Sequence, residues 1–137
     1  NNATKLGTIT HKIFELYWDK FDEIDIELIL NKFEIIEENE QLKIKNSIEY
    51  FKNSDVYKLL KSGVEHRFEL EFNYQDKKGF IDLVYFDKSK AGWVIVDFKT
   101  GIKSKEKEEK YQKQLEFYEE VLNDIGMSVV GKEILWT

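Results

Sequence analysis

Two aspartates in this sequence are spaced so that they could meet across a β-hairpin. Residues 78–87 and 92–99 have the apolar and aromatic content of strands, and only a short polar segment separates them. A turn centred on residues 89–90 would place Asp82 opposite Asp97, with Cβ atoms about 4.5–5.5 Å apart. Two carboxylates that close repel each other and resist joint ionisation, so a compensating cation is expected. Oxygen ligands of this kind suit Mg²⁺, Mn²⁺ or Ca²⁺.

A lysine completes this group of charged side chains. Successive strand residues point to opposite faces, so Lys99 shares a face with Asp97, and Phe98 between them points into the core. A metal held by the two aspartates could bind phosphate and lower the pKa of a bound water. Lys99 could orient that water or stabilise charge that develops on the phosphate oxygens. The pattern therefore predicts hydrolytic chemistry at a phosphate.

The alternative is that these charges form an ordinary solvated strand face. The three residues before Asp97 are Val94-Ile95-Val96, which indicates a largely buried strand. Charged side chains are rarely buried without a partner. With Asp82 expected opposite, the chemical interpretation is favoured.

The elements that must position this group follow from hydrophobic periodicity. Residues 8–20 have helical spacing, and Thr8 or Thr10 is a candidate N-cap. The remaining expected elements are two or three helices within 25–60, strands over 65–74, 78–87 and 92–99, a helix over 106–123, and a strand over 129–136. This order predicts an α/β (α+β) fold with a mixed central sheet flanked by helices.

Length and composition exclude several classes of protein. The chain has 137 residues, which suits one domain, and it has no cysteine, which excludes disulfide scaffolds, thiolate zinc sites and iron–sulfur clusters. The net charge of −6 argues against general coating of nucleic acid. No membrane span and no signal peptide are expected, which predicts a cytoplasmic location. The chain begins at Asn1 without a methionine, so we expect a fragment of a larger protein.

Five short motifs resemble, in order, those of the PD-(D/E)XK nuclease superfamily, and in particular the nuclease domain of RecB- and AddA-type helicase–nucleases. The resemblance covers roughly residues 7–136, and one position departs from it, because Glu71 stands where a proline is usual. The motifs are Gly7-Thr8-x-x-His11, Glu69-Leu70-Glu71-Phe72, Gly79-Phe80-Ile81-Asp82, Val96-Asp97-Phe98-Lys99-Thr100-Gly101 and Tyr111-x-x-Gln114-x-x-x-Tyr118.

The resemblance implies a restriction-endonuclease-like core and a role for each matching residue. His11, Asp82 and Asp97 would bind Mg²⁺ (or Mn²⁺), together with the backbone carbonyl of Phe98, and Lys99 would be catalytic. Residues that would support the site or contact DNA are Glu69, Tyr111, Gln114 and Tyr118. Gln114 and Tyr118 are four residues apart, so they share one face of a helix.

Some of these residues also have a structural interpretation. A single histidine on an apolar helix, such as His11, is often packed and hydrogen-bonded without binding a metal, and Tyr118 could be a core aromatic. Glu69 and Glu71 are expected on one strand face, so either could be the acid near the site. His66 matches no motif and is expected to be structural.

The resemblance also implies a function and partners. It indicates a metal-dependent DNA exonuclease module in double-strand-break repair and recombination, which acts with helicase domains of the same chain and with a second helicase–nuclease subunit. One alternative is a stand-alone exonuclease of the phage or CRISPR-associated kind, several of which carry an iron–sulfur cluster that this sequence cannot hold. Another is a catalytically inactive DNA-binding module, against which the joint presence of Asp82, Asp97 and Lys99 argues.

Overall fold

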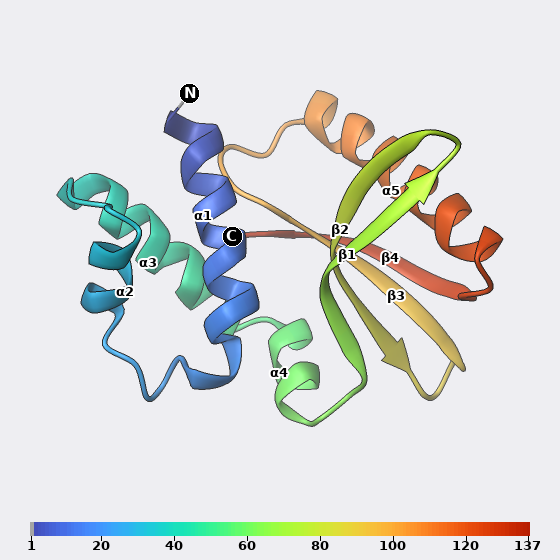
Figure 1. Ribbon diagram of the computed structural model, residues 1–137, viewed down its shortest axis with the longest axis horizontal. Helices are drawn as coiled ribbons and strands as arrows, with labels where there is room; N and C mark the ends of the chain where they lie inside the picture. The colour runs from blue at the N-terminus through green and yellow to red at the C-terminus, as the bar shows by residue number, and fades with distance from the viewer. Residues whose placement is uncertain (1) are drawn as a thin grey trace. The chain divides into compact units, whose positions relative to one another are not determined.

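The computed structural model describes the backbone of residues 2–137 and the side chains from residue 4 onward. It contains two compact units, each described here by itself. The helical unit runs to Lys58 and includes Thr137, and the sheet unit is Leu59–Trp136. The mixed helix and strand content confirms the predicted α/β class (Figure 1).

The helices have the following bounds: α1 Asn2–Tyr17, α2 Ile26–Lys32, α3 Glu38–Lys52, α4 Asp55–Lys61 and α5 Lys105–Asp124, with a 3₁₀ turn at Trp18–Lys20. Three helices therefore occupy the region where two or three were predicted. The predicted N-cap of the first helix is wrong. The helix already includes Asn2, and the hydroxyls of Thr8 and Thr10 donate to the carbonyls of Thr4 and Leu6 inside it.

An aromatic cluster forms the core of the helical unit. The Phe14 ring of α1 lies 4.4 Å from that of Phe51 on α3, and both approach Phe21. Tyr57 packs edge-on against Phe51 and donates its hydroxyl proton to the Trp18 carbonyl at 2.8 Å. The buried phenol thereby keeps a hydrogen-bond partner, which fixes the 3₁₀ turn after α1 against α4.

The sheet unit has four strands in the order β1-β2-β3-β4, with bounds β1 His66–Tyr74, β2 Lys77–Asp87, β3 Gly92–Lys99 and β4 Val129–Trp136. The first three form an antiparallel meander, and β4 runs parallel to β3. Parallel neighbours need a crossover connection. Helix α5 supplies it, and its buried residues Leu115, Tyr118, Val121 and Leu122 pack on one sheet face (Figure 1).

The β2–β3 turn sets the register of the two central strands. The Asp87 carboxylate accepts hydrogen bonds from the N–H groups of Ser89 and Lys90, which closes a short turn. The ladder pairs Asp87 with Gly92 and ends at Leu83 with Val96, which confirms the predicted register.

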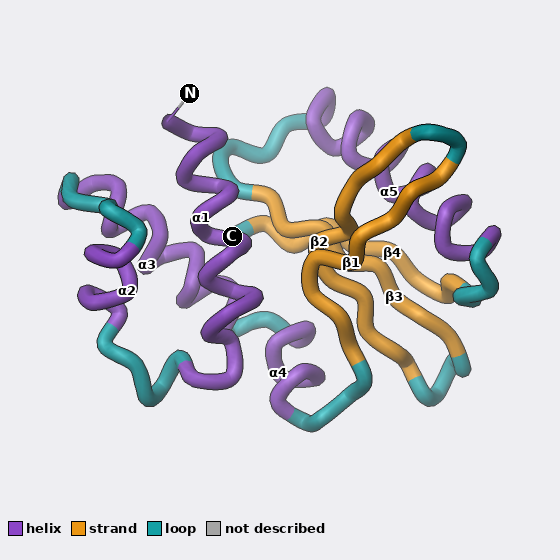
Figure 2. Tube along the Cα trace, viewed as in Figure 1, coloured by secondary structure: helices purple, strands orange, loops and turns teal. Residues whose placement is uncertain are grey.

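Strand β2 is longer than its ladder with β3. Its pairing with β1 continues to Lys77 opposite Tyr74, whereas no pair with β3 lies beyond Leu83. Figure 2 shows the outer part of the β1–β2 hairpin leaving β3 and β4. The two central strands of the sheet, β2 and β3, therefore separate at Asp82.

Candidate active site

The point where β2 and β3 separate is occupied by the Asp82 side chain. With no β2 carbonyl opposite it, the Phe98 N–H donates instead to Asp82 Oδ2 at 2.8 Å. The Phe98 ring is buried, as predicted, and stacks on Phe68 with centroids 6.4 Å apart. The separation of β2 and β3 therefore leaves the Asp82 carboxylate between the two strands, where the Phe98 N–H holds it.

Asp97 lies beside this carboxylate and is almost completely buried, with 2% of its surface exposed. Burial, followed by the charge of Asp97, raises the pKa of Asp82 to about 9. The hydrogen bond from Phe98 N–H acts in the opposite direction and is outweighed. Without a further cation, the Asp82 carboxyl group therefore keeps its proton at neutral pH.

Lys99 faces Asp97, as the strand alternation predicts. Its ammonium Nζ lies 3.0 Å from Asp97 Oδ2 in an ion pair whose carboxylate is buried. The approach does not have hydrogen-bond geometry, and among the described residues Asp97 Oδ2 is a buried oxygen without a hydrogen-bond partner. A buried carboxylate oxygen in this state retains lone pairs that a metal ion could use.

Helix α5 brings two more side chains to Lys99. The Lys99 ammonium donates to Gln114 Oε1 at 3.3 Å and lies 4.2 Å from the centroid of the Tyr111 ring. Tyr111 and Gln114 are three residues apart on the helix, so both side chains project from one face. The predicted supporting residues Tyr111 and Gln114 therefore contact the lysine directly.

Tyr118 belongs both to the core and to the surroundings of the acids. Its ring packs 5.7 Å from that of Phe72 and is 8% exposed. Burial, followed by the charges of Asp97, Asp82 and Glu69, raises the pKa of Tyr118 to about 12. The two interpretations of this residue are thus compatible, since a core aromatic on α5 also faces the acidic group.

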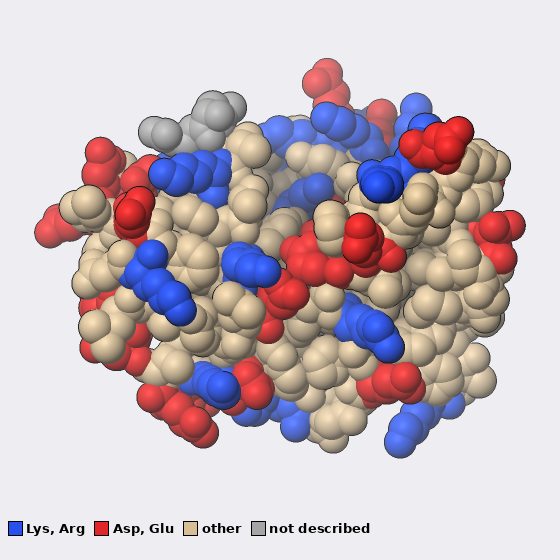
Figure 3. All heavy atoms as spheres, in the orientation of Figure 1, with Lys and Arg blue, Asp and Glu red and all other residues tan. Residues whose placement is uncertain are grey.

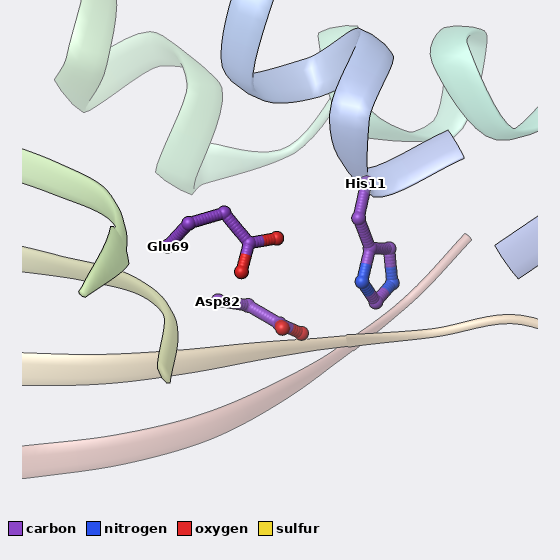
Figure 4. Close-up of side chains that lie close together, drawn as sticks. All are labelled: His11, Glu69 and Asp82. Atoms are coloured by element: carbon purple, nitrogen blue, oxygen red, sulfur yellow. The ribbon is translucent and has the colours of Figure 1, made fainter. Parts of the chain in front are cut away.

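Glu69 interrupts the β1–β2 ladder at the level of Asp82. Pairing passes from Phe68 with Leu83 to Leu70 with Ile81, and Glu69 between them has a left-handed φ of 50°. Figure 4 shows the Glu69 and Asp82 carboxylates turned toward the same space. The Glu69 charge also contributes to the raised pKa of Asp82. A strained non-glycine residue inside a strand often marks a functional position.

The structure distinguishes Glu69 from Glu71, which the sequence could not. Glu71 is exposed and pairs with Phe80, with regular β-ladder geometry. His11 is a partly buried residue of α1 in the helical unit. His66 Nδ1 lies 2.9 Å from the Val64 carbonyl oxygen, which agrees with a structural role.

The donor set fits a divalent metal ion. Glu69, Asp82 and Asp97 could supply carboxylate oxygens, and Asp97 Oδ2 pairs with the Lys99 ammonium but accepts no hydrogen bond. Hard cations prefer such ligands.

A family comparison agrees with this geometry. The family model of the PD-(D/E)XK nuclease superfamily matches residues 1–136. The chain therefore belongs to the PD-(D/E)XK nuclease superfamily, whose members are nucleases that use divalent metals. Comparison with curated proteins gave no match. No described helix is long and apolar enough to cross a membrane.

Proposed function

We propose that this domain is a Mg²⁺- or Mn²⁺-dependent DNA exonuclease, the nuclease module of a RecB/AddA-type helicase–nuclease in double-strand-break repair and recombination. The observation that carries the nuclease assignment is the Lys99–Asp97 ion pair beside Asp82. The RecB/AddA assignment rests on the five motifs and their order along the chain.

We assign the metal ligands to His11, Asp82, Asp97 and the Phe98 carbonyl, with Glu69 as a further carboxylate. What supports the assignment is the donor chemistry. Glu69 and Asp82 of the sheet unit turn their carboxylates toward the same space (Figure 4), and the motif Gly7-Thr8-x-x-His11 is the support for the histidine. Asp97 adds the buried oxygen that lacks a hydrogen-bond partner. An ion held there would neutralise phosphate charge and lower the pKa of a bound water.

The chain's own residues then divide the work of phosphodiester hydrolysis. Lys99 presents a fixed positive charge where negative charge grows on the non-bridging phosphate oxygens. Gln114 orients the Lys99 ammonium through the 3.3 Å hydrogen bond. Tyr118 closes the apolar side of the acids and keeps water from that side, which strengthens the electrostatic interactions inside.

The charge distribution suggests that DNA affinity comes mostly from elsewhere. The chain carries a net charge of −6, and acidic and basic side chains are interspersed over the face drawn in Figure 3. Tight binding to a phosphate backbone needs many lysine and arginine contacts. Helicase domains of the same chain, and a second helicase–nuclease subunit, would supply them in the cytoplasm.

A digestion assay tests the proposed activity. End-labelled linear duplex, linear single-stranded DNA and covalently closed circular DNA are incubated with the purified chain in Mg²⁺ or Mn²⁺, beside Asp97→Ala. We expect loss of the linear substrates, survival of the circle, and no digestion by Asp97→Ala or in EDTA. Cutting of the circle would show an endonuclease. Metal-independent digestion, or digestion by Asp97→Ala, would overturn the proposed site.

A further inference from the structure

The Lys99 ammonium is surrounded on three sides by groups of different chemistry. Asp97 contributes a carboxylate oxygen at 3.0 Å and Gln114 an amide oxygen at 3.3 Å. The third group is the Tyr111 ring, whose centroid lies 4.2 Å from Lys99 Nζ. A cation within about 6 Å of a ring centroid is attracted by the negative face of the aromatic system.

The Tyr111 ring is itself held in place by a second aromatic side chain. Trp136 of β4 lies 6.0 Å from it, with an interplanar angle of 53°. Trp136 is also the residue that pairs with Lys99 across the parallel β3–β4 ladder. Helix α5 and the Trp136 side chain of β4 therefore fix the Tyr111 ring relative to the position of Lys99 on β3.

A lysine needs such support to act at one fixed point. Its flexible four-carbon stem gives the ammonium many positions, and a charge stabilises a transition state best when it is already in position. Asp97 alone would draw the ammonium onto its own oxygen. The ring and the amide oxygen are neutral, so they hold the cation without cancelling its charge.

We infer that Tyr111 is a positioning residue that holds the Lys99 ammonium through the face of its ring, and that its hydroxyl is not needed for this. The contact itself follows from the geometry, whereas its catalytic purpose rests on the proposed function. Phenylalanine keeps a ring face and leucine does not. Tyr111→Phe should therefore preserve the contact with the Lys99 ammonium, and Tyr111→Leu should lose it.

Nuclear magnetic resonance tests the contact independently of any activity. In metal-free protein with ¹³C-labelled lysine, the ring current should move the Lys99 ε-CH₂ protons upfield, and Lys99→Arg identifies the signal by removing it. We expect the upfield shift to persist in Tyr111→Phe and to disappear in Tyr111→Leu. Lys77 serves as an internal control, because its Nζ lies 5.3 Å from the Phe117 ring, and its signal should not move.

Single-turnover digestion then tests the purpose of the contact. Tyr111→Leu should lower the rate constant at saturating DNA by about 10-fold, within the range expected of a partly desolvated cation–π contact, with little change in the DNA concentration at half-saturation. Tyr111→Phe should stay within about 2-fold of wild type. Tyr50→Leu, at an exposed tyrosine of α3, is the matched control, and thermal unfolding monitors the fold of each variant.

Each contrary result has a distinct meaning. An unshifted Lys99 signal in the wild type overturns the contact. Loss of rate in Tyr111→Phe as large as in Tyr111→Leu shows that the hydroxyl acts, which overturns the assignment to the ring face. Weaker DNA binding at an unchanged rate makes Tyr111 a DNA contact instead. A wild-type chain that digests no DNA overturns the proposed function and the catalytic purpose, while the lysine signal still decides the contact.

Discussion

The main-chain N–H of Phe98 donates a 2.8 Å hydrogen bond to the Asp82 carboxylate at the point where β2 leaves β3. The bond holds this carboxyl group beside buried Asp97. The hydrogen bond is thus part of the backbone pairing of the sheet as well as of the acidic site. Changes at Asp82 should therefore affect both stability and metal binding.

The metal-free domain should lose stability as pH rises. The pKa of Asp82 is raised from 3.8 to about 9 in the folded chain, so the folded state holds a proton that the unfolded state releases. This stabilising contribution is complete below about pH 4 and is lost as pH rises through 9. The free energy of unfolding should fall by at most about 1.4 kcal/mol per pH unit between these limits. Urea denaturation in EDTA at several pH values from 5 to 9 measures it.

Asp82→Asn is the control for this pH dependence, because it keeps the shape of the side chain and removes the titrating proton. Its free energy of unfolding should change less with pH over the same window. Parallel pH profiles for the wild type and Asp82→Asn would contradict the raised pKa of Asp82.

The two histidines should differ in their effect on metal affinity. His11→Ala removes a proposed ligand, whereas His66→Ala removes a residue whose ring nitrogen lies beside the Val64 carbonyl. Calorimetric titration with Mn²⁺ should show weaker binding for His11→Ala and unchanged binding for His66→Ala. Equal affinities in the two variants and the wild type would remove His11 from the ligand set.

Lys99→Ala should abolish most cleavage while metal and DNA binding remain. One lysine supplies about one of many phosphate contacts, but a preorganised charge acts mainly on the transition state. Losing one such group costs about 10²–10³ in rate. Lys99→Arg should recover only part of the activity, because a planar guanidinium replaces a compact charge. Rates come from single-turnover digestion in saturating Mg²⁺, and a near-normal rate for Lys99→Ala would reject this mechanism.

Glu69→Gly should make the domain more stable and less active. The left-handed φ of 50° strains the backbone at a glutamate but not at a glycine. The free energy of unfolding should therefore rise by about 1 kcal/mol in Glu69→Gly. The substitution also removes a carboxylate beside Asp82 and should weaken metal binding. Glu69→Gln is the control that keeps the backbone strain but loses the charge. Thermal unfolding and Mn²⁺ titration of both variants separate the two effects, and a destabilised Glu69→Gly would argue against strain at this residue.

The sequence alone was sufficient to predict the β2–β3 hairpin, its register, and the shared strand face of Asp97 and Lys99. A short turn after Asp87 restricts the register to very few choices, and the strand period of two then assigns Asp97 and Lys99 to one face. These are local constraints, so they can be read from residue spacing.

Other features depended on contacts between distant segments. Strand alternation alone predicted that either Glu69 or Glu71 could be the acid near the site. In the structure, Glu69 has a left-handed backbone at the level where β2 leaves β3, and its carboxylate lies near Asp82. Tyr111 and Gln114 meet Lys99 because α5 packs across the sheet, with Leu115 and Leu122 in its core. Such contacts come from burial of apolar surface by the whole unit, and no local spacing encodes them.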